Sequence, residues 1–200
     1  MPVTTSLALI CGAVHRDVLW RLLRSVAQYP HKIVDEVVVT YNGGDWSPLP
    51  LQGPLAYFAR DLCGREVGGT LYDTMEEVEV RILPQAWRDD AAAARNESFA
   101  SCRGDWILWC DADDGLAGAR RTRAATGATL DRPLGAWLAA LPTDVGAVTI
   151  PYQYDAGYRQ RRPALLRRVV KWYWDRSVHE TLRLPADAAA NYRSIDWDGL

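Results

Sequence analysis

The sequence lacks several features, and each absence narrows the class of protein. Its four cysteines include no CxxC pair, and no histidine lies at zinc-ligand spacing, which argues against a structural zinc site. No apolar run reaches the length of about 18 residues that a membrane-spanning helix needs, and no charged start with an apolar stretch marks a secretory signal. With 25 acidic and 23 basic residues, the chain has no net basic charge that would favour nucleic acid. We therefore expect a cytoplasmic protein with no membrane span, in which Cys11 and Cys110 are buried thiols.

Phenylalanine and lysine are also scarce. The sequence has two Phe beside nine Trp and nine Tyr, and two Lys beside 21 Arg. Trp and Tyr suit surfaces that stack on sugars or bases, although Trp also packs in ordinary cores. Arg binds phosphate and carboxylate through paired hydrogen bonds, although a GC-rich genome gives the same surplus. Between residues 155 and 183, eight basic residues stand against three acidic ones, so this segment is a candidate for holding an anion.

The order of apolar patterns predicts an α/β fold in one domain of 200 residues. A strand at 6–11, a helix from 17 to about 30 and a strand at 36–41 form a unit that requires a parallel sheet. Further strands are expected at 78–83, 105–110, 146–154, 165–174 and 178–184, with helices at 89–101 and 133–141 and a short one at 55–62. In such a sheet the ligand binds at the carboxyl ends of the strands.

Three carboxylates directly follow the strand predicted at 105–110. Asp111, Asp113 and Asp114 repel one another, and a shared Mn²⁺ or Mg²⁺ relieves that repulsion. Such an ion takes its remaining ligands from water and phosphate oxygens, which implies a diphosphate ligand. A solvated Asp-rich turn is the other interpretation of these residues.

The stretch around these carboxylates resembles the family 2 glycosyltransferases. Residues 87–114 read WRDDAAAARNESFASCRGDWILWCDADD, and that family has an Ala-Arg-Asn helix start, a Gly-Asp turn and an apolar strand leading into Asp-x-Asp. The late Val178-His179-Glu180 is similar to the branch associated with lipopolysaccharide core sugars. The resemblance implies a GT-A fold, a Rossmann-like and mostly parallel sheet flanked by helices, with a mixed C-terminal strand region. It divides the single domain into a nucleotide-binding half, about 1–114, and an acceptor and catalytic half, about 115–200.

The resemblance also implies roles for individual residues. Asp111 would contact the nucleotide ribose or the metal, Asp113 would bind the metal directly, and Asp114 would be a neighbouring support. Arg95 would reach the nucleotide through its guanidinium, while Asn96 is expected to hold the local backbone.

The position that reads the base departs from the family pattern. Family members usually carry an Asp after the second strand, where this chain has Thr40-Tyr41-Asn42. Either Tyr41 replaces that Asp by stacking or through its hydroxyl, or Asp45 takes over from a shifted turn.

Residues 171–180 contain the candidates for the catalytic base. An inverting transfer needs a group that takes the proton from the acceptor hydroxyl as it attacks. Similar family members use a late acidic residue, so Glu180 is the first candidate and Asp175 the reserve. His179 is a third metal ligand, a donor to the diphosphate or a structural histidine. The aromatics at 172–174 would form a sugar-stacking wall, with at least one of them pointing into the core.

Two arginines just before this segment are weaker candidates. Arg167 and Arg168 would neutralise the departing diphosphate or attract an anionic acceptor, unless they are solvated charges.

The sequence thus predicts an inverting, metal-dependent glycosyltransferase with a nucleotide-diphosphate sugar as donor. The acceptor hydroxyl would belong to a glycan, a lipid-linked sugar, a protein or a modified base. A metal-dependent nucleotidyltransferase is an alternative, but residues 11–16 are a poor version of its Gly-rich phosphate loop. A non-catalytic nucleotide-sugar or carbohydrate-binding protein is another. Because the core uses nearly the whole chain, we expect a homodimer interface, a partner or a small exposed acceptor to complete the site.

Overall fold

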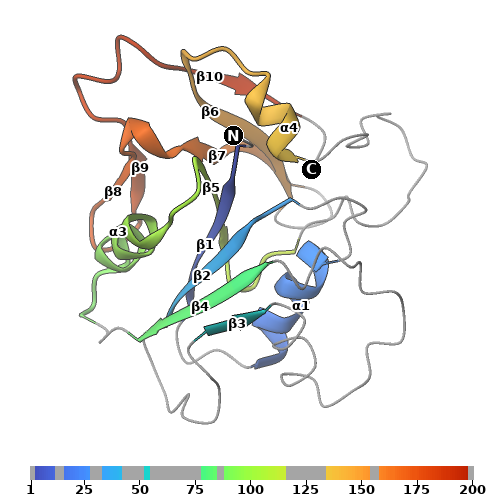
Figure 1. The fold of residues 1–200 in the computed structure, drawn as a ribbon. Helices are drawn as coiled ribbons and strands as arrows, with labels where there is room; N and C mark the ends of the chain where they lie inside the picture. Colours follow the sequence, from blue (N-terminus) through green and yellow to red (C-terminus); the bar gives the residue numbers. More distant parts are fainter. Residues whose placement is uncertain are drawn as a thin grey trace.

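The computed structural model describes residues 3–11, 16–27, 33–41, 52–54, 78–84, 88–115, 134–153 and 158–197. Within them lies a mixed eight-stranded sheet in the order β10-β6-β7-β5-β1-β2-β4-β3, with a separate two-stranded sheet of β8 and β9 (Figure 1). The elements are, in chain order, β1 (Thr5–Cys11), α1 (Arg16–Ala27), β2 (Glu36–Tyr41), β3 (Gln52–Pro54), β4 (Glu79–Pro84), α3 (Ala91–Ser101), β5 (Trp106–Asp111), α4 (Leu134–Ala139), β6 (Val145–Gln153), β7 (Arg159–Arg167), the 3-10 turn η3 (Arg168–Val170), β8 (Tyr173–Asp175), β9 (Thr181–Arg183) and β10 (Arg193–Asp196).

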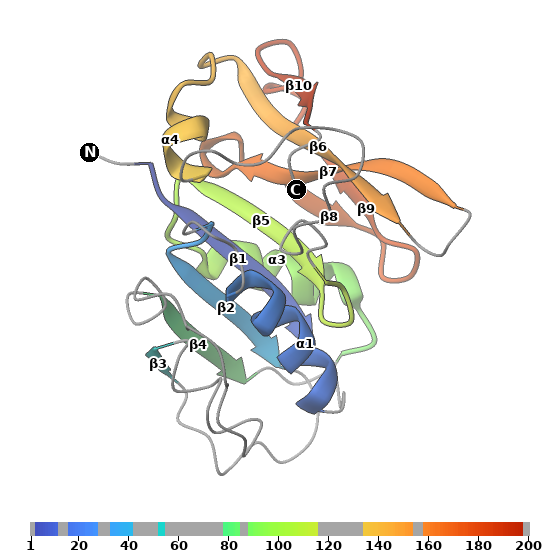
Figure 2. The same ribbon diagram turned by 90° about the vertical axis from the view of Figure 1, so that its right-hand side faces the viewer.

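The centre of the sheet is parallel, as the sequence predicts. β1 pairs in parallel with β2 and with β5, and β2 pairs in parallel with β4. The last residues of three of these strands, Cys11, Tyr41 and Asp111, therefore meet at one edge of the sheet (Figure 2). β7 runs antiparallel between β5 and β6, and β10 pairs in parallel with β6. The α/β class and the mixed C-terminal strand region are confirmed.

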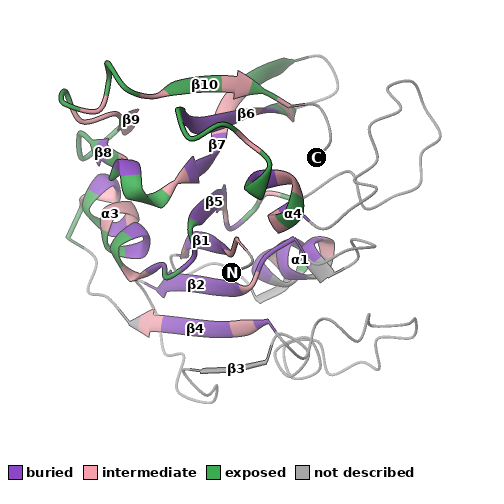
Figure 3. Ribbon diagram, turned by 45° about the horizontal axis from the view of Figure 1, so that its top comes forward, coloured by how far each residue is buried: buried purple, intermediate pink, exposed green. Residues whose placement is uncertain are grey.

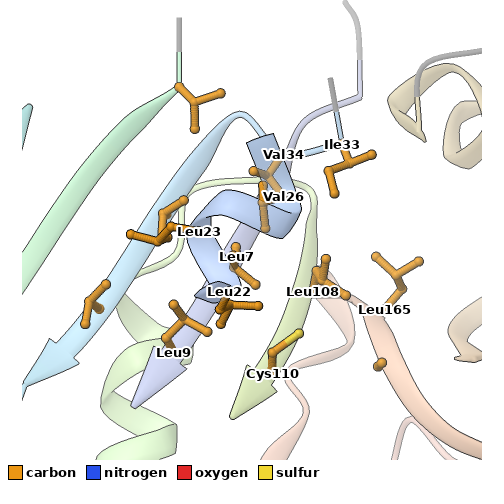
Figure 4. Close-up of a cluster of buried hydrophobic side chains, with 14 of the residues drawn as sticks. Leu7, Leu9, Leu22, Leu23, Val26, Ile33, Val34, Leu108, Cys110 and Leu165 are labelled. Carbon is orange, nitrogen blue, oxygen red and sulfur yellow. The ribbon is translucent and has the colours of Figure 1, made fainter. Parts of the chain in front are cut away.

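A helix covers each face of the central sheet. Leu7 and Leu9 of β1 pack with Leu22 and Leu23 of α1 in one cluster (Figure 4). Side chains alternate along a strand, so Ala8 points the other way, into a second cluster that includes residues of α3 and β5. The central strands are accordingly buried along most of their length, while β8 and β10 are largely exposed and β9 is mostly of intermediate burial (Figure 3).

α3 begins one residue after a capping aspartate. Asp90 is the N-cap, and its side chain accepts a hydrogen bond from the Ala93 amide at 2.9 Å. Asp89 precedes it in the left-handed region with φ 54°. The sequence predicts both acids inside the first turn, whereas the helix begins at Ala91 because Asp90 is extended.

A buried ion pair fixes the other end of α3 to the sheet. Arg81 Nη2 donates to Glu36 Oε2 at 2.8 Å and to the Ser101 carbonyl at 2.6 Å. Glu36 Oε1 accepts from the Ser6 hydroxyl and the Arg103 amide, each at 2.6 Å. Burial acts to raise the pKa of Glu36, but these hydrogen bonds and the Arg81 charge outweigh it and hold the pKa below its ordinary value.

Several predicted elements differ from the structure. The strand expected at 165–174 is wrong, since β7 ends at Arg167, η3 follows, and Lys171 adopts a left-handed conformation with φ 59° before β8. The strand expected at 178–184 is reduced to β9, and the sequence patterns miss β3 and β10. The short helix expected at 55–62 lies outside the described residues.

Two further expectations concern the whole chain. Cys11, Cys102 and Cys110 are buried thiols, as predicted for the first and the last, and burial raises the pKa of Cys11 to about 11. No helix in the described part of the chain is long and apolar enough to cross a membrane.

Candidate active site

The three carboxylates lie at the carboxyl end of β5, and Asp111 faces α3. Leu108 and Cys110 belong to the cluster on the α1 face and Trp109 to the cluster on the α3 face. Alternation along the strand therefore places Asp111 on the α3 face. The Asp114 amide donates to the Asp111 carbonyl at 3.0 Å, and the Asp111 amide donates to Asp114 Oδ2 at 2.9 Å. The turn after β5 is thus closed by its own acidic residues.

Arg95 of α3 joins Asp111 to Glu180. Its Nη2 donates to Asp111 Oδ1 at 2.6 Å and its Nε donates to Glu180 Oε1 at 2.8 Å. The guanidinium carbon lies 5.4 Å from the ring centroid of Trp109 and 4.8 Å from that of Trp174, and the side chain is only 11% exposed. Burial acts to lower the pKa of Arg95, but the charges and hydrogen bonds of Asp111 and Glu180 outweigh it and raise the pKa. Arg95 is a fixed cation between two acidic side chains from distant segments.

The next residue, Asn96, holds β8 against α3. Its Nδ2 donates to the Trp174 carbonyl at 2.9 Å, and the Trp174 amide donates to Asn96 Oδ1 at 2.7 Å. The Ala91 amide at the start of α3 donates to the Ser177 carbonyl at 3.2 Å. Asn96 does hold backbone, as the sequence suggests, but the backbone lies 78 residues away rather than nearby. α3 therefore positions the whole β8–β9 hairpin.

Alternation along β8 separates its side chains. Trp174 is buried against Trp109, with ring centroids 4.7 Å apart, and against Phe99 at 6.1 Å. Tyr173 and Asp175 point to the opposite side and are exposed. One aromatic of the 172–174 stretch pointing into the core is what the sequence predicts, and Trp174 is that residue.

The two candidate bases have different surroundings. Asp175 is 52% exposed and lies 3.7 Å from Arg183, on the outer side of the hairpin. Glu180 is 19% exposed and is held on Arg95 by Oε1. Within the described part of the chain, Oε2 of Glu180 has no hydrogen-bond partner. The structure brings Glu180, and not Asp175, to Asp111.

Two residues that the sequence analysis did not single out complete the cluster. Arg162 of β7 contacts Asp114 Oδ2 through Nη2 at 2.5 Å and lies 3.6 Å from Asp111 Oδ2 through Nη1. The Tyr152 hydroxyl donates to Asp114 Oδ1 at 2.5 Å. Burial, followed by this bond to Asp114, raises the pKa of Tyr152 above its ordinary value, so the phenol stays a donor. The Arg162 guanidinium also lies over the rings of Tyr152 at 3.6 Å and Trp109 at 4.3 Å.

Strand register is the signal that identifies Arg162. Leu108 pairs with Leu165 on the antiparallel strand. The ladder ends at this pair, but both strands continue past it, and Arg162 Nη1 lies 3.6 Å from Asp111 Oδ2. The sequence contains this spacing but does not show that β7 is the neighbour of β5.

Arg167 and Arg168, the weaker candidates for the diphosphate or an anionic acceptor, lie away from the Asp111 cluster. Arg167 pairs with Trp106 at the amino end of β5, and its Nε donates to a backbone carbonyl of β6 at 2.7 Å. Arg168 Nε donates to the Gly104 carbonyl at 2.6 Å. Trp106 and Asp111 are five positions apart, roughly 16 Å in an extended strand. Both arginines support the opposite end of the sheet.

The predicted metal ligands are not assembled as a set of three. Among the described residues, no three His, Cys, Asp or Glu side chains lie close enough together to hold a metal. His179 is exposed on the hairpin loop with φ 54°, and both oxygens of Asp111 face arginines. Asp113 is exposed and has no hydrogen-bond or ion-pair partner in the described segments. One open carboxylate fits Mn²⁺ or Mg²⁺ of the kind that takes its other ligands from water and phosphate.

The two candidates for reading the base have different outcomes. Tyr41 is 9% exposed and packs in the apolar cluster on the α1 face. A ring enclosed in this way offers no open face for a base, so the stacking role is not supported. Asp45 lies outside the described residues.

Comparison with known proteins gives a family match and one curated relative. The model of the family described as glycosyl transferase family 2 matches residues 70–173. A TPR repeat-containing protein of Synechococcus elongatus is 33% identical over 121 residues, which cover 60% of this chain and 29% of that protein.

Two solved structures are similar to this chain. TarS 1-349 of S. aureus in complex with UDP has a TM-score of 0.51 at 12% identity, covering 86% of this chain and 50% of that chain. The mannosyltransferase PcManGT of Pyrobaculum calidifontis, in complex with GDP-Man and Mn²⁺, has a TM-score of 0.47 at 15% identity, covering 76% and 36%. The chain spans half or less of the length of each of these relatives. The likeness to TarS bears out the GT-A fold.

Proposed function

The chain belongs to glycosyl transferase family 2, and from this membership we propose that it transfers a sugar from a nucleotide-diphosphate sugar to an acceptor hydroxyl. The observation that carries the proposal is the Arg95 bridge between Asp111 and Glu180. This bridge supports the proposal because Asp111 and Glu180 share one guanidinium at the edge of the sheet where α/β folds bind ligands.

We propose that the donor binds over the Asp111–Asp114 turn. Asp111, Asp113, Asp114 and Glu180 bring four formal negative charges, and Arg95 and Arg162 bring two positive ones. The excess of two negative charges suits a divalent cation. Asp113 is the side chain that would hold it, because the other carboxylates are already bonded. When bound, Mn²⁺ or Mg²⁺ would stabilise the charge that develops on the leaving diphosphate.

Glu180 is the proposed base. Its Oε1 is fixed by Arg95, while Oε2, which has no partner among the described residues, would accept the proton of the acceptor hydroxyl. The acceptor oxygen then bonds to the anomeric carbon as the bond to the diphosphate breaks. One base and one displacement give inversion at that carbon. Asn96 supports this step by fixing the hairpin that carries Glu180.

The loop beside Glu180 is the proposed contact for the acceptor. Val178 is 66% exposed and His179 is exposed beside Glu180, so this loop would meet the acceptor first. The Val178-His179-Glu180 sequence supports an acceptor of the lipopolysaccharide core type.

A calorimetric panel tests the proposal. UDP and GDP are titrated into the protein with and without Mn²⁺, and hydrolysis of the corresponding nucleotide sugars is measured in parallel. We expect one nucleotide to bind with Mn²⁺ at least about tenfold more tightly than without it, and Asp113→Asn to abolish that difference. Metal-independent binding together with full turnover in Asp113→Asn would contradict the donor site. Nucleotide binding without turnover of any sugar would favour a binding protein.

A further inference from the structure

Arg162 contacts the carboxylates of Asp111 and Asp114, which lie on either side of Asp113 in the sequence. It contacts Asp114 Oδ2 at 2.5 Å and Asp111 Oδ2 at 3.6 Å, and the remaining oxygens of these residues bind Tyr152 and Arg95. All four carboxylate oxygens therefore face a donor or a cation supplied by the protein.

The position of Arg162 is fixed by its surroundings. The guanidinium is held between the rings of Tyr152 and Trp109, and its side chain is 12% exposed. Its Nε is buried and has no hydrogen-bond partner in the described part of the chain. A guanidinium enclosed in this way is poorly hydrated, so its charge acts on the two carboxylates with little screening.

This arrangement affects how strongly the Asp111–Asp114 turn binds a metal ion. Three carboxylates in four residues would by themselves attract a divalent cation strongly. With Asp111 and Asp114 engaged, Asp113 is the one carboxylate of this turn that has no partner among the described residues. One carboxylate holds Mn²⁺ or Mg²⁺ weakly. The ion then needs phosphate oxygens to complete its ligands.

We propose that Arg162 is a built-in counter-cation that keeps Asp111 and Asp114 from binding the metal in the free enzyme, so that the metal enters and leaves with the nucleotide diphosphate. The inference rests on the proposed metal-dependent function. It makes Arg162 a positioning residue that acts through the two aspartates.

The test is Mn²⁺ binding by the purified protein, followed by electron paramagnetic resonance with and without UDP. Three variants are compared with the wild type: Arg162→Met, which removes the charge and keeps an apolar chain between the rings, Arg162→Lys, which keeps the charge, and Arg193→Met. The last removes an exposed arginine paired with Asp144 and controls for net charge. Thermal melting confirms that each variant is folded.

The expected result is tighter Mn²⁺ binding, which loss of structure would not produce. Without UDP, Arg162→Met should bind Mn²⁺ about tenfold more tightly than the wild type, while Arg162→Lys and Arg193→Met stay near the wild-type value. UDP should tighten Mn²⁺ binding strongly in the wild type and much less in Arg162→Met.

Two results overturn the inference. The first is Mn²⁺ binding by Arg162→Met that is no tighter than the wild type while Arg162→Lys is folded and unchanged. The second is wild-type protein that binds Mn²⁺ equally well with and without UDP. Failure of the proposed function looks different, because wild-type protein would then bind neither UDP nor GDP with any metal.

Discussion

At the scale of single residues, Arg95 connects the two halves of the proposed chemistry. Its guanidinium uses one nitrogen for Asp111 and another for Glu180 while lying over two tryptophan rings. A planar fork satisfies these contacts at once, and a compact ammonium does not.

We predict that Arg95→Lys lowers kcat about 100-fold because the base and the donor carboxylate lose their common anchor. Arg167→Lys is the matched control, since Arg167 supports the opposite end of the sheet. Steady-state kinetics with the preferred nucleotide sugar measure both. Equal kcat values in the two variants would contradict the role of Arg95.

Local motifs in the sequence identify residues that the structure brings into contact. Asp111 and Arg95 were named from one short stretch, and Glu180 from a short late motif, and the structure brings the three together. Arg162 and Tyr152 carry no such motif, because their place depends on which strands are neighbours. Arg167 and Arg168 were chosen by charge alone, and charge does not tell one end of a strand from the other.

At the scale of elements, α3 orders the site by holding the β8–β9 hairpin. Asn96 makes two hydrogen bonds to the backbone of Trp174, and the first amide of α3 binds the hairpin loop. The hairpin has three-residue strands, so it depends on this support.

We predict that Asn96→Ala lowers the free energy of unfolding by about 1–3 kcal/mol, because two backbone groups of Trp174 lose their partners. It should also lower kcat with little change in donor KM, since Glu180 moves and the donor turn does not. Asn191→Ala is the control, because its side chain makes one exposed hydrogen bond. Urea denaturation and steady-state kinetics measure both effects. A change confined to the KM for the donor would contradict the role of Asn96 in holding the hairpin.

Element boundaries were predictable where chain-local patterns decide them. β1, α1 and β2 follow from apolar spacing, because neighbouring segments pair directly. The prediction of a strand at 165–174 was wrong because Lys171 has a left-handed conformation, which the neighbouring residue types do not indicate. β10 was missed because its pairing with β6 joins segments about 50 residues apart.

At the scale of the whole molecule, the buried ion pair that stabilises the fold and the proposed site lie at different ends of the sheet. The Arg81–Glu36 pair sits at the amino ends of the strands, and the Asp111 cluster sits at the carboxyl end of β5. The parallel sheet between them was predictable, but the position of β7 beside β5 was not, because the apolar pattern of a segment does not tell which strand it pairs with.

We predict that stability falls in acid through Glu36. Its pKa in the folded protein lies below the ordinary value of 4.5, so its contribution is present above pH 4.5 and is lost as the pH falls through the folded-state pKa. The difference in unfolding free energy between wild type and Glu36→Gln should therefore shrink as the pH is lowered from 7 into that range. Urea denaturation at each pH measures it, with Glu79→Gln, which removes an exposed ion pair, as control. A difference that stays constant with pH would argue against this assignment.

The central claim is that Glu180, held by Arg95, is the base of a sugar transfer. Its most direct test is single-turnover transfer from the preferred nucleotide sugar by wild type, Glu180→Gln and Asp175→Asn. We predict that Glu180→Gln binds the donor normally and transfers about 10²–10⁴-fold more slowly, while Asp175→Asn matches the wild type. A transfer rate of Glu180→Gln equal to that of the wild type would contradict the account. So would a comparable loss of transfer rate in Asp175→Asn alone.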